Sequence, residues 1–161
     1  RGEAVRLRAV RVRTKDEQVA EKIDIRKPVG LEMEYEVLKS GHKLMASFEL
    51  WNEEGICLID SVEYDLTWRG RARLIGRYRA TAWIPGNYLA EGTFFVSAFI
   101  ETLDPHKKQI RESQIVAFSV VDTCEGDSAR GDFAGRLKGV VRPLLDWNTE
   151  LRAESIQTEH V

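Results

Sequence analysis

Cysteine and histidine are scarce in this sequence of 161 residues, which has two cysteines, Cys57 and Cys124, and three histidines. A domain of this size does not need a disulfide, and neither residue type has the spacing of a zinc site. We therefore expect no metal, no cofactor and a reducing compartment. Apolar runs of about 18 residues, the length of a transmembrane helix, are also missing, and no signal-peptide pattern follows Arg1.

An excess of one charge is missing as well. The 24 basic and 26 acidic residues leave a net charge of −2, whereas nucleic-acid-binding domains are usually strongly basic. The length suits one domain. Because the sequence begins with Arg1 rather than Met, we expect it to be a piece of a longer protein.

The common signatures of catalysis are missing too. The sequence has no G-x-x-x-x-G-K-[ST] phosphate loop, no G-x-S-x-G turn and no His-Glu-x-x-His pair, so we expect no enzymatic activity from this piece. Glu32, Glu34 and Glu36 have the spacing of residues on one face of a strand. We interpret them as a solvated face paired with Arg77 and Arg79, not as the acid and base of a glycosidase.

Alternation of apolar and polar residues dominates the sequence and indicates half-buried strands. The pattern predicts strands over residues 4–13, 29–37, 44–52, 56–66, 76–84, 93–101 and 113–121, with a change of phase near Ala9 in the first. Residues 69–73 are predicted to form a loop, and helix is tolerable only near Tyr88 or after Asn148. Short strands separated by Gly, Pro and Asn are typical of a β-sandwich. The predicted core is Met33, Tyr35, Phe48, Leu50, Ala82, Phe94, Val96 and Phe118.

A polar break over residues 122–132 divides this single domain. We expect a sandwich core over residues 1–122, a hinge and last strand over 123–147, and a tail over 148–161. A strand behind a hinge can pair within its own chain or with a partner subunit.

Several aromatic residues lie on the polar side of their strands. Trp51 shares its face with Ser47 and Glu49, and Phe95 and Phe99 share theirs with Ser97. Trp83 likewise accompanies Thr81 and Arg79. Exposed rings indicate a contact surface, a second packed layer or a ligand platform. Rings beside short polar groups suit sugars, since the ring covers the C–H face of a pyranose and the polar groups bind its hydroxyls. The candidate glycan-binding residues are Trp51, Phe95, Phe99, Ser47, Glu49 and Ser97.

Four segments carry a resemblance to a known family. The first segment, residues 76–78, reads G-x-Y, and the second, residues 83–94, contains I-P, L and G-x-F in that order. The other two segments, residues 117–122 and 139–147, follow at the expected spacing, and the last ends in Trp147. Together they resemble the C-terminal domain of Wzt-type proteins, the ATP-binding subunits of O-antigen polysaccharide ABC transporters. The resemblance covers residues 5–147, and the last dozen residues match no pattern.

The resemblance implies an all-β, immunoglobulin-like antiparallel β-sandwich that binds O-antigen polysaccharide, at its non-reducing end in some members. It implies a cytoplasmic module at the inner face of the inner membrane. A nucleotide-binding domain would precede it in the same chain, so that the full-length protein is an ATPase subunit, and a transmembrane transporter subunit would be its partner. It also implies a homodimer that exchanges its C-terminal strands. No contact residue follows from the family, since contacts vary with the glycan.

In an immunoglobulin-like order, residues 44–52 and 93–101 are predicted neighbours in one sheet, with residues 113–121 on its edge. Two alternatives to a carbohydrate-binding module stay open from the sequence. One is a structural or protein-interaction sandwich whose exposed rings are buried against another subunit, and the other is a glycan-modifying enzyme. Glycan binding by the isolated domain would distinguish the carbohydrate-binding module from the protein-interaction sandwich.

Overall fold

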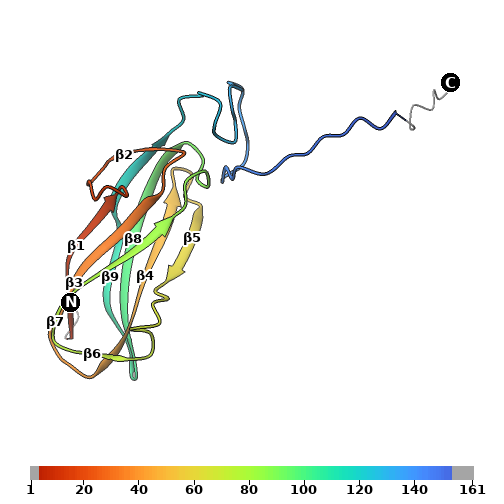
Figure 1. Cartoon of the computed structure of the whole chain (residues 1–161). Helices are drawn as coiled ribbons and strands as arrows, with labels where there is room; N and C mark the ends of the chain where they lie inside the picture. Colours follow the sequence, from red (N-terminus) through yellow and green to blue (C-terminus); the bar gives the residue numbers. More distant parts are fainter. Residues whose placement is uncertain (1–3, 154–161) are drawn as a thin grey trace.

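The computed structural model describes residues 4–153, and its strands form two sheets that pack face to face (Figure 1). The first sheet has the order β1-β3-β7 and the second β2-β9-β8-β4-β5, and the short β6 pairs with the start of β4. All pairings are antiparallel except that of β2 with β9. The strands are β1 (Val5–Arg13), β2 (Lys22–Asp24), β3 (Val29–Val37), β4 (His42–Asn52), β5 (Cys57–Val62), β6 (Ala72–Arg73), β7 (Gly76–Ile84), β8 (Gly92–Leu103) and β9 (His106–Val121).

The period-two pattern predicts most of these strands well. β3 and β7 have the predicted bounds, β4, β8 and β9 extend the predicted ranges, and β5 occupies part of its range. The change of phase expected near Ala9 is a bulge between Leu7 and Ala9, where the register of β1 against β3 shifts. The all-β sandwich is therefore confirmed, and residues 4–153 contain no α-helix.

The inner faces of the two sheets form one apolar core. Seven of the eight predicted core residues are buried, and Ala82 packs against them at the edge of the core. The Phe94 and Phe118 rings stack across β8 and β9 with their centroids 5.6 Å apart. Burial of large apolar side chains from both sheets is the main stabilising contribution to such a fold.

Two local predictions were wrong. Residues 69–73 are not all loop, because Ala72 and Arg73 pair with the start of β4. Arg73 is buried there, and its guanidinium donates to the Leu44 carbonyl oxygen at 3.2 Å and to Glu63 Oε1 at 2.6 Å. β9 is not an edge strand over its last three residues, since β2 pairs with it. Residues 148–152 of the expected tail contain no helix, and residues 154–161 lie outside the described residues.

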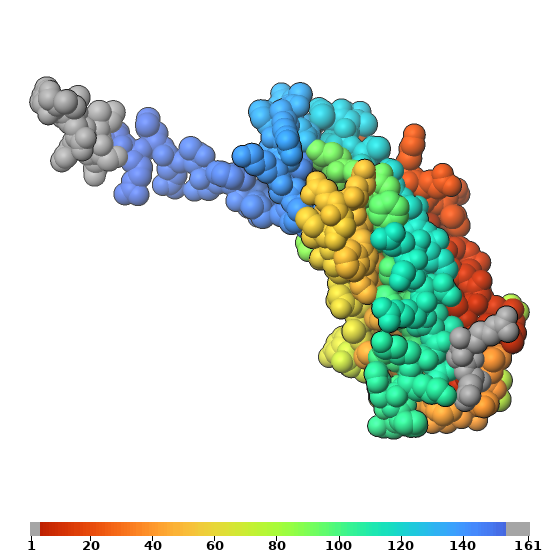
Figure 2. Space-filling view, turned by 180° about the vertical axis from the view of Figure 1, so that it is seen from behind, coloured from red at the N-terminus to blue at the C-terminus, as the bar shows by residue number. Residues whose placement is uncertain are grey.

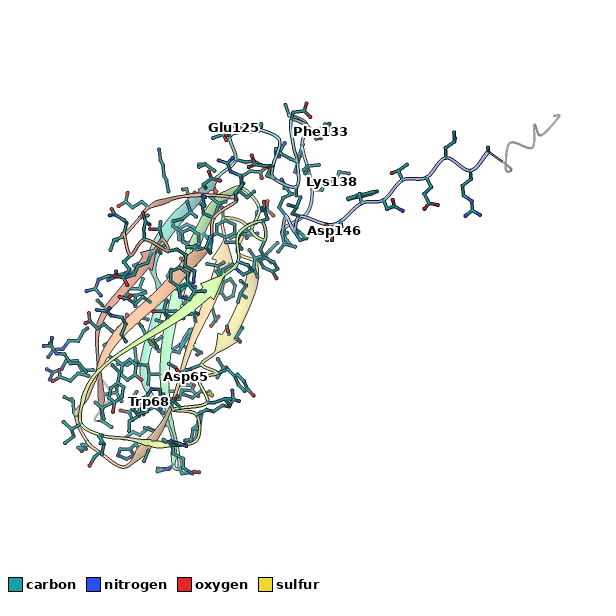
Figure 3. The ribbon with its side chains drawn as sticks, viewed as in Figure 1. Asp65, Trp68, Glu125, Phe133, Lys138 and Asp146 are labelled. Carbon is teal, nitrogen blue, oxygen red and sulfur yellow. The ribbon has the colours of Figure 1, made fainter. Side chains whose placement is uncertain are left out.

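After β9 the chain covers one end of the sandwich and then runs away from it in extended form (Figures 1 and 2). Figure 3 shows Glu125, Phe133 and Lys138 at this end, whereas Asp65 and Trp68 lie at the other. We call residues 122–144, which cover this end, the covering segment. It is held to the β7–β8 connection, where the Arg142 amide donates to Tyr88 O at 2.7 Å and the Leu144 amide to Asn87 O at 3.1 Å.

An ionic cluster reinforces this attachment. Arg142 is buried and its Nη1 donates to both Glu91 carboxylate oxygens, at 3.0 and 2.8 Å, and Arg130 also pairs with Glu91. Burial acts to raise the pKa of Glu91, but hydrogen bonds from its own backbone, Arg142 and Arg130 outweigh it and lower the pKa. The carboxylate therefore stays charged and fastens residues 130–142 to the sandwich.

Candidate functional site

The six candidate residues meet on the outer face of the second sheet. β4 and β8 are hydrogen-bonded neighbours, as predicted, and their register places Trp51 opposite Phe95, Glu49 opposite Ser97 and Ser47 opposite Phe99. Directly opposite residues in an antiparallel pair have Cβ atoms about 5 Å apart. We call the outward side chains of β4 and β8 from Ser47 to Trp51 and from Phe95 to Phe99 the aromatic face.

The three rings of the aromatic face are half-buried, so each presents one side to solvent. Phe95 and Phe99 are four residues apart on β8, which separates them by about 13 Å along the strand. Trp51 lies beside Phe95 and is fixed by a hydrogen bond from its Nε1 to Glu49 Oε2 at 3.2 Å. The face thus offers a pair of rings at one end, a single ring at the other and a carboxylate between them.

Ser97 is the candidate least able to reach a ligand. It is buried, and its Oγ accepts a hydrogen bond from the Gln114 backbone amide at 2.9 Å. Gln114 has a positive φ of 49° and lies where the β8–β9 register shifts. Gln114 is exposed at this bulge, although strict alternation along residues 113–121 would place it on the same side as the buried Phe118. Ser97 therefore supports the aromatic face by holding the bulge of β9.

Sequence reasoning missed polar groups that flank the aromatic face. Asp60 on β5 pairs with Glu49, and Arg111 on β9 pairs with Phe99. Cys57 lies opposite Trp51, and its thiol pKa is raised by burial and then by the negative charges of Glu49 and Asp60. Only the pairing register brings these residues together, because neither the alternation in β5 nor that in β9 specifies which residues lie opposite.

A groove of about 360 Å³ continues the aromatic face at the end of β4. Its lining includes Asn52, Glu53 and Thr93, and Arg136 and Lys138 of the covering segment. Glu53 Oε1 accepts from the Thr93 amide at 2.8 Å, which joins the β4–β5 turn to the start of β8. A chain-like ligand on the aromatic face could therefore extend into a recess with polar walls.

This arrangement defines the class of protein. A sheet of order β1-β3-β7 packed on a sheet containing β9-β8-β4-β5 is an immunoglobulin-like antiparallel β-sandwich. Within that class, the chain is similar to a solved structure described as the crystal structure of the C-terminal domain of Wzt. The TM-score is 0.68 at 11% sequence identity, and the match covers 94% of this chain and 86% of the other.

The likeness to the C-terminal domain of Wzt confirms the resemblance that the sequence motifs indicated, and at this level of identity it establishes the shared fold. No protein-family model matches the sequence, and no curated protein does. No helix among residues 4–153 is long and apolar enough to cross a membrane.

Proposed function

We propose that this chain is a carbohydrate-binding module that recognises an O-antigen polysaccharide for export by an ABC transporter. The observation that carries the proposal is the aromatic face, where Trp51 and Phe95 lie side by side and Phe99 lies further along β8. The proposal is also supported by the fold, which this chain shares with the C-terminal domain of Wzt over nearly its whole length.

Binding would combine stacking with hydrogen bonds. A pyranose placed over the Trp51 and Phe95 rings would bury its C–H face, and its hydroxyls would lie within reach of Glu49 and Asp60. The Trp51–Glu49 hydrogen bond orders the ring before a sugar binds, so less conformational entropy is lost on binding. The second sugar of the chain would lie toward Phe99 and Arg111 or toward the groove beside Thr93.

The proposal extends to the context of the module. A nucleotide-binding domain in the same chain and a transmembrane transporter subunit would be its partners. The module would then act on the cytoplasmic side, without chemistry of its own, and would select the non-reducing end of the glycan.

We also propose that residues 123–147 mediate a homodimer. Leu144 and Leu145 are more than half exposed and Trp147 is 89% exposed, on a segment that leaves the sandwich in extended form (Figure 1). Apolar side chains of that size on an extended segment gain stability when a second copy covers them. Exchange of this segment between two subunits would cover them.

Glycan binding by the 161-residue chain tests the central proposal. Isothermal titration against a panel of purified O-polysaccharides should give saturable binding with one glycan and none with the others. A chain that binds no glycan in the panel, yet forms a stable complex with another protein that sugars do not affect, would instead support the protein-interaction sandwich.

A further inference from the structure

The outer face of the first sheet is strongly charged, and the proposed sugar site does not use it. β3 contributes Glu32, Glu34 and Glu36 to this face, and β1 and β7 lie on either side of β3. The cations that surround these three carboxylates are Arg6, Arg8, Arg11 and Arg13 of β1, Arg77 and Arg79 of β7, and Lys15 just after β1. We call these ten residues the cationic face, which has a positive balance although the whole chain has a net charge of −2.

Glu32, the most buried of the three carboxylates, lies beneath the cations. Glu32 has a side chain only 3% exposed and is paired with Arg13 Nε at 2.6 Å and Arg11 Nη1 at 3.2 Å. Arg11 also donates to Glu34 at 2.9 Å, and its hydrogen bond lowers the pKa of Glu34 against the effect of burial. The expected pairing of the glutamates with β7 is therefore mostly wrong, because β1 supplies most of their partners. From β7, Arg79 pairs with Glu32, with Nε 3.8 Å from Oε1 and a side chain 58% exposed. The expected solvated face is also wrong for Glu32, which is buried.

Two arginines of the cationic face lie outside these ion pairs. Arg6 and Arg77 flank Glu36 in the register, yet neither makes an ion pair within residues 4–153, and Glu36 is held by Arg8. Three carboxylates that are each paired with arginine, together with two guanidinium groups outside these ion pairs, give a surface with a positive potential.

One aromatic ring completes the face. Trp83 is 40% exposed on β7 and packs over Gly30, where a Cβ atom would come within 2.9 Å of its ring. Lys15 Nζ lies 3.8 Å from the centroid of the same ring. Trp83 is therefore held on the cationic face by contacts on two sides, at the end away from Arg77 and Glu36.

From these contacts we infer that the cationic face binds the surface of a membrane rich in anionic phospholipids. The face combines several cations with a single tryptophan, the side chain that favours the headgroup level of a bilayer. A protein interface has an apolar core around its anchor residues. Trp83 has no such surroundings on this face, because its neighbours there are Thr81, Lys15 and charged side chains. The face extends over three neighbouring strands, which suits an extended anionic surface better than a small ligand.

This inference is independent of the proposed sugar site, since the two faces lie on different sheets. Vesicle co-sedimentation tests it with the whole chain. We expect binding to vesicles of phosphatidylglycerol and phosphatidylcholine at low salt, little binding to phosphatidylcholine alone, and loss of binding as salt screens the charges. Each cation beside an anionic membrane contributes about fivefold in affinity.

The experiment compares two double variants, each of which removes two positive charges. Arg6→Gln/Arg77→Gln should weaken vesicle binding at least tenfold, whereas Lys43→Gln/Arg71→Gln, at exposed positions outside the cationic face, should leave it unchanged. Equal melting temperatures of the two variants would show that the fold is intact. Failure of the unmodified chain to bind phosphatidylglycerol vesicles, or equal loss in both variants, would overturn the inference. So would binding through this face to an acidic protein or soluble polyanion but not to vesicles.

Discussion

Removal of the Trp51 ring is the sharpest test of the aromatic face. The ring lies beside Phe95 and is oriented by Glu49, so Trp51→Ala removes both a stacking surface and the partner that orders the Glu49 carboxylate. Stacking of a ring on a ligand is worth roughly 1–3 kcal/mol in the related case of nucleic-acid bases. We therefore expect glycan affinity to fall about tenfold or more, which corresponds to about 1.4 kcal/mol.

The same assay needs a control for the general loss of a tryptophan. Trp83→Ala is matched, because Trp83 is a half-exposed tryptophan on a strand of the other sheet. Titration of each variant with the glycan that the unmodified chain binds should show a loss only for Trp51→Ala, and Phe99→Ala should act in the same way. Melting temperatures near that of the unmodified chain would show that the outward rings are not needed for folding. Unchanged affinity in the Trp51→Ala/Phe99→Ala double variant would exclude the aromatic face as the glycan site.

Three further predictions concern the fold and its assembly. Phe48→Ala or Phe118→Ala should each lower the free energy of unfolding by about 3–5 kcal/mol, because both rings are buried; urea unfolding measures the loss, and a change under about 1 kcal/mol would contradict the assigned core. A chain ending at Gly131 should be monomeric or aggregated by light scattering, and a well-folded dimer would refute segment exchange. The hydrogen bond from Arg26 lowers the pKa of Asp24 from 3.8 to about 2, so its contribution to stability is complete above about pH 4 and disappears as the pH falls toward 2. Both side chains are partly exposed, so this contribution is no more than about 1 kcal/mol. In Asp24→Asn, the free energy of unfolding should therefore fall by up to that much less between about pH 4 and pH 2, as measured by urea unfolding at several pH values.

Local periodicity was sufficient to predict the strands that have one buried face. In β3, Met33 and Tyr35 alternate with glutamates, and a shift by one residue would place every glutamate in the core. The pattern therefore fixes both the bounds and the orientation of β3. The same reasoning placed Trp51, Phe95 and Phe99 on outward faces correctly.

Features that depend on contacts distant in sequence could not be predicted in this way. Arg73 is buried only because Glu63 and the Leu44 carbonyl accept its hydrogen bonds, and a buried arginine without such partners would be very costly. The bulge of β9 likewise depends on the Ser97 hydroxyl of another strand. Asp60 joins the candidate site through the register of β5 against β4, which no single-strand pattern contains.

The two sheets contact each other only through the core, so the outer face of one sheet can differ in chemistry from the outer face of the other. Side chains from β3 and β4 that point inward meet in one apolar layer, whereas those that point outward are separated by the full thickness of the sandwich. Packed sheets lie about 10 Å apart, and changes at sites separated by that distance without shared partners are nearly additive. Guanidinium groups above Glu32 and aromatic rings beside Glu49 can therefore serve separate partners. A domain built in this way could lie against an anionic surface through Arg77 and still present the opposite sheet to a glycan chain.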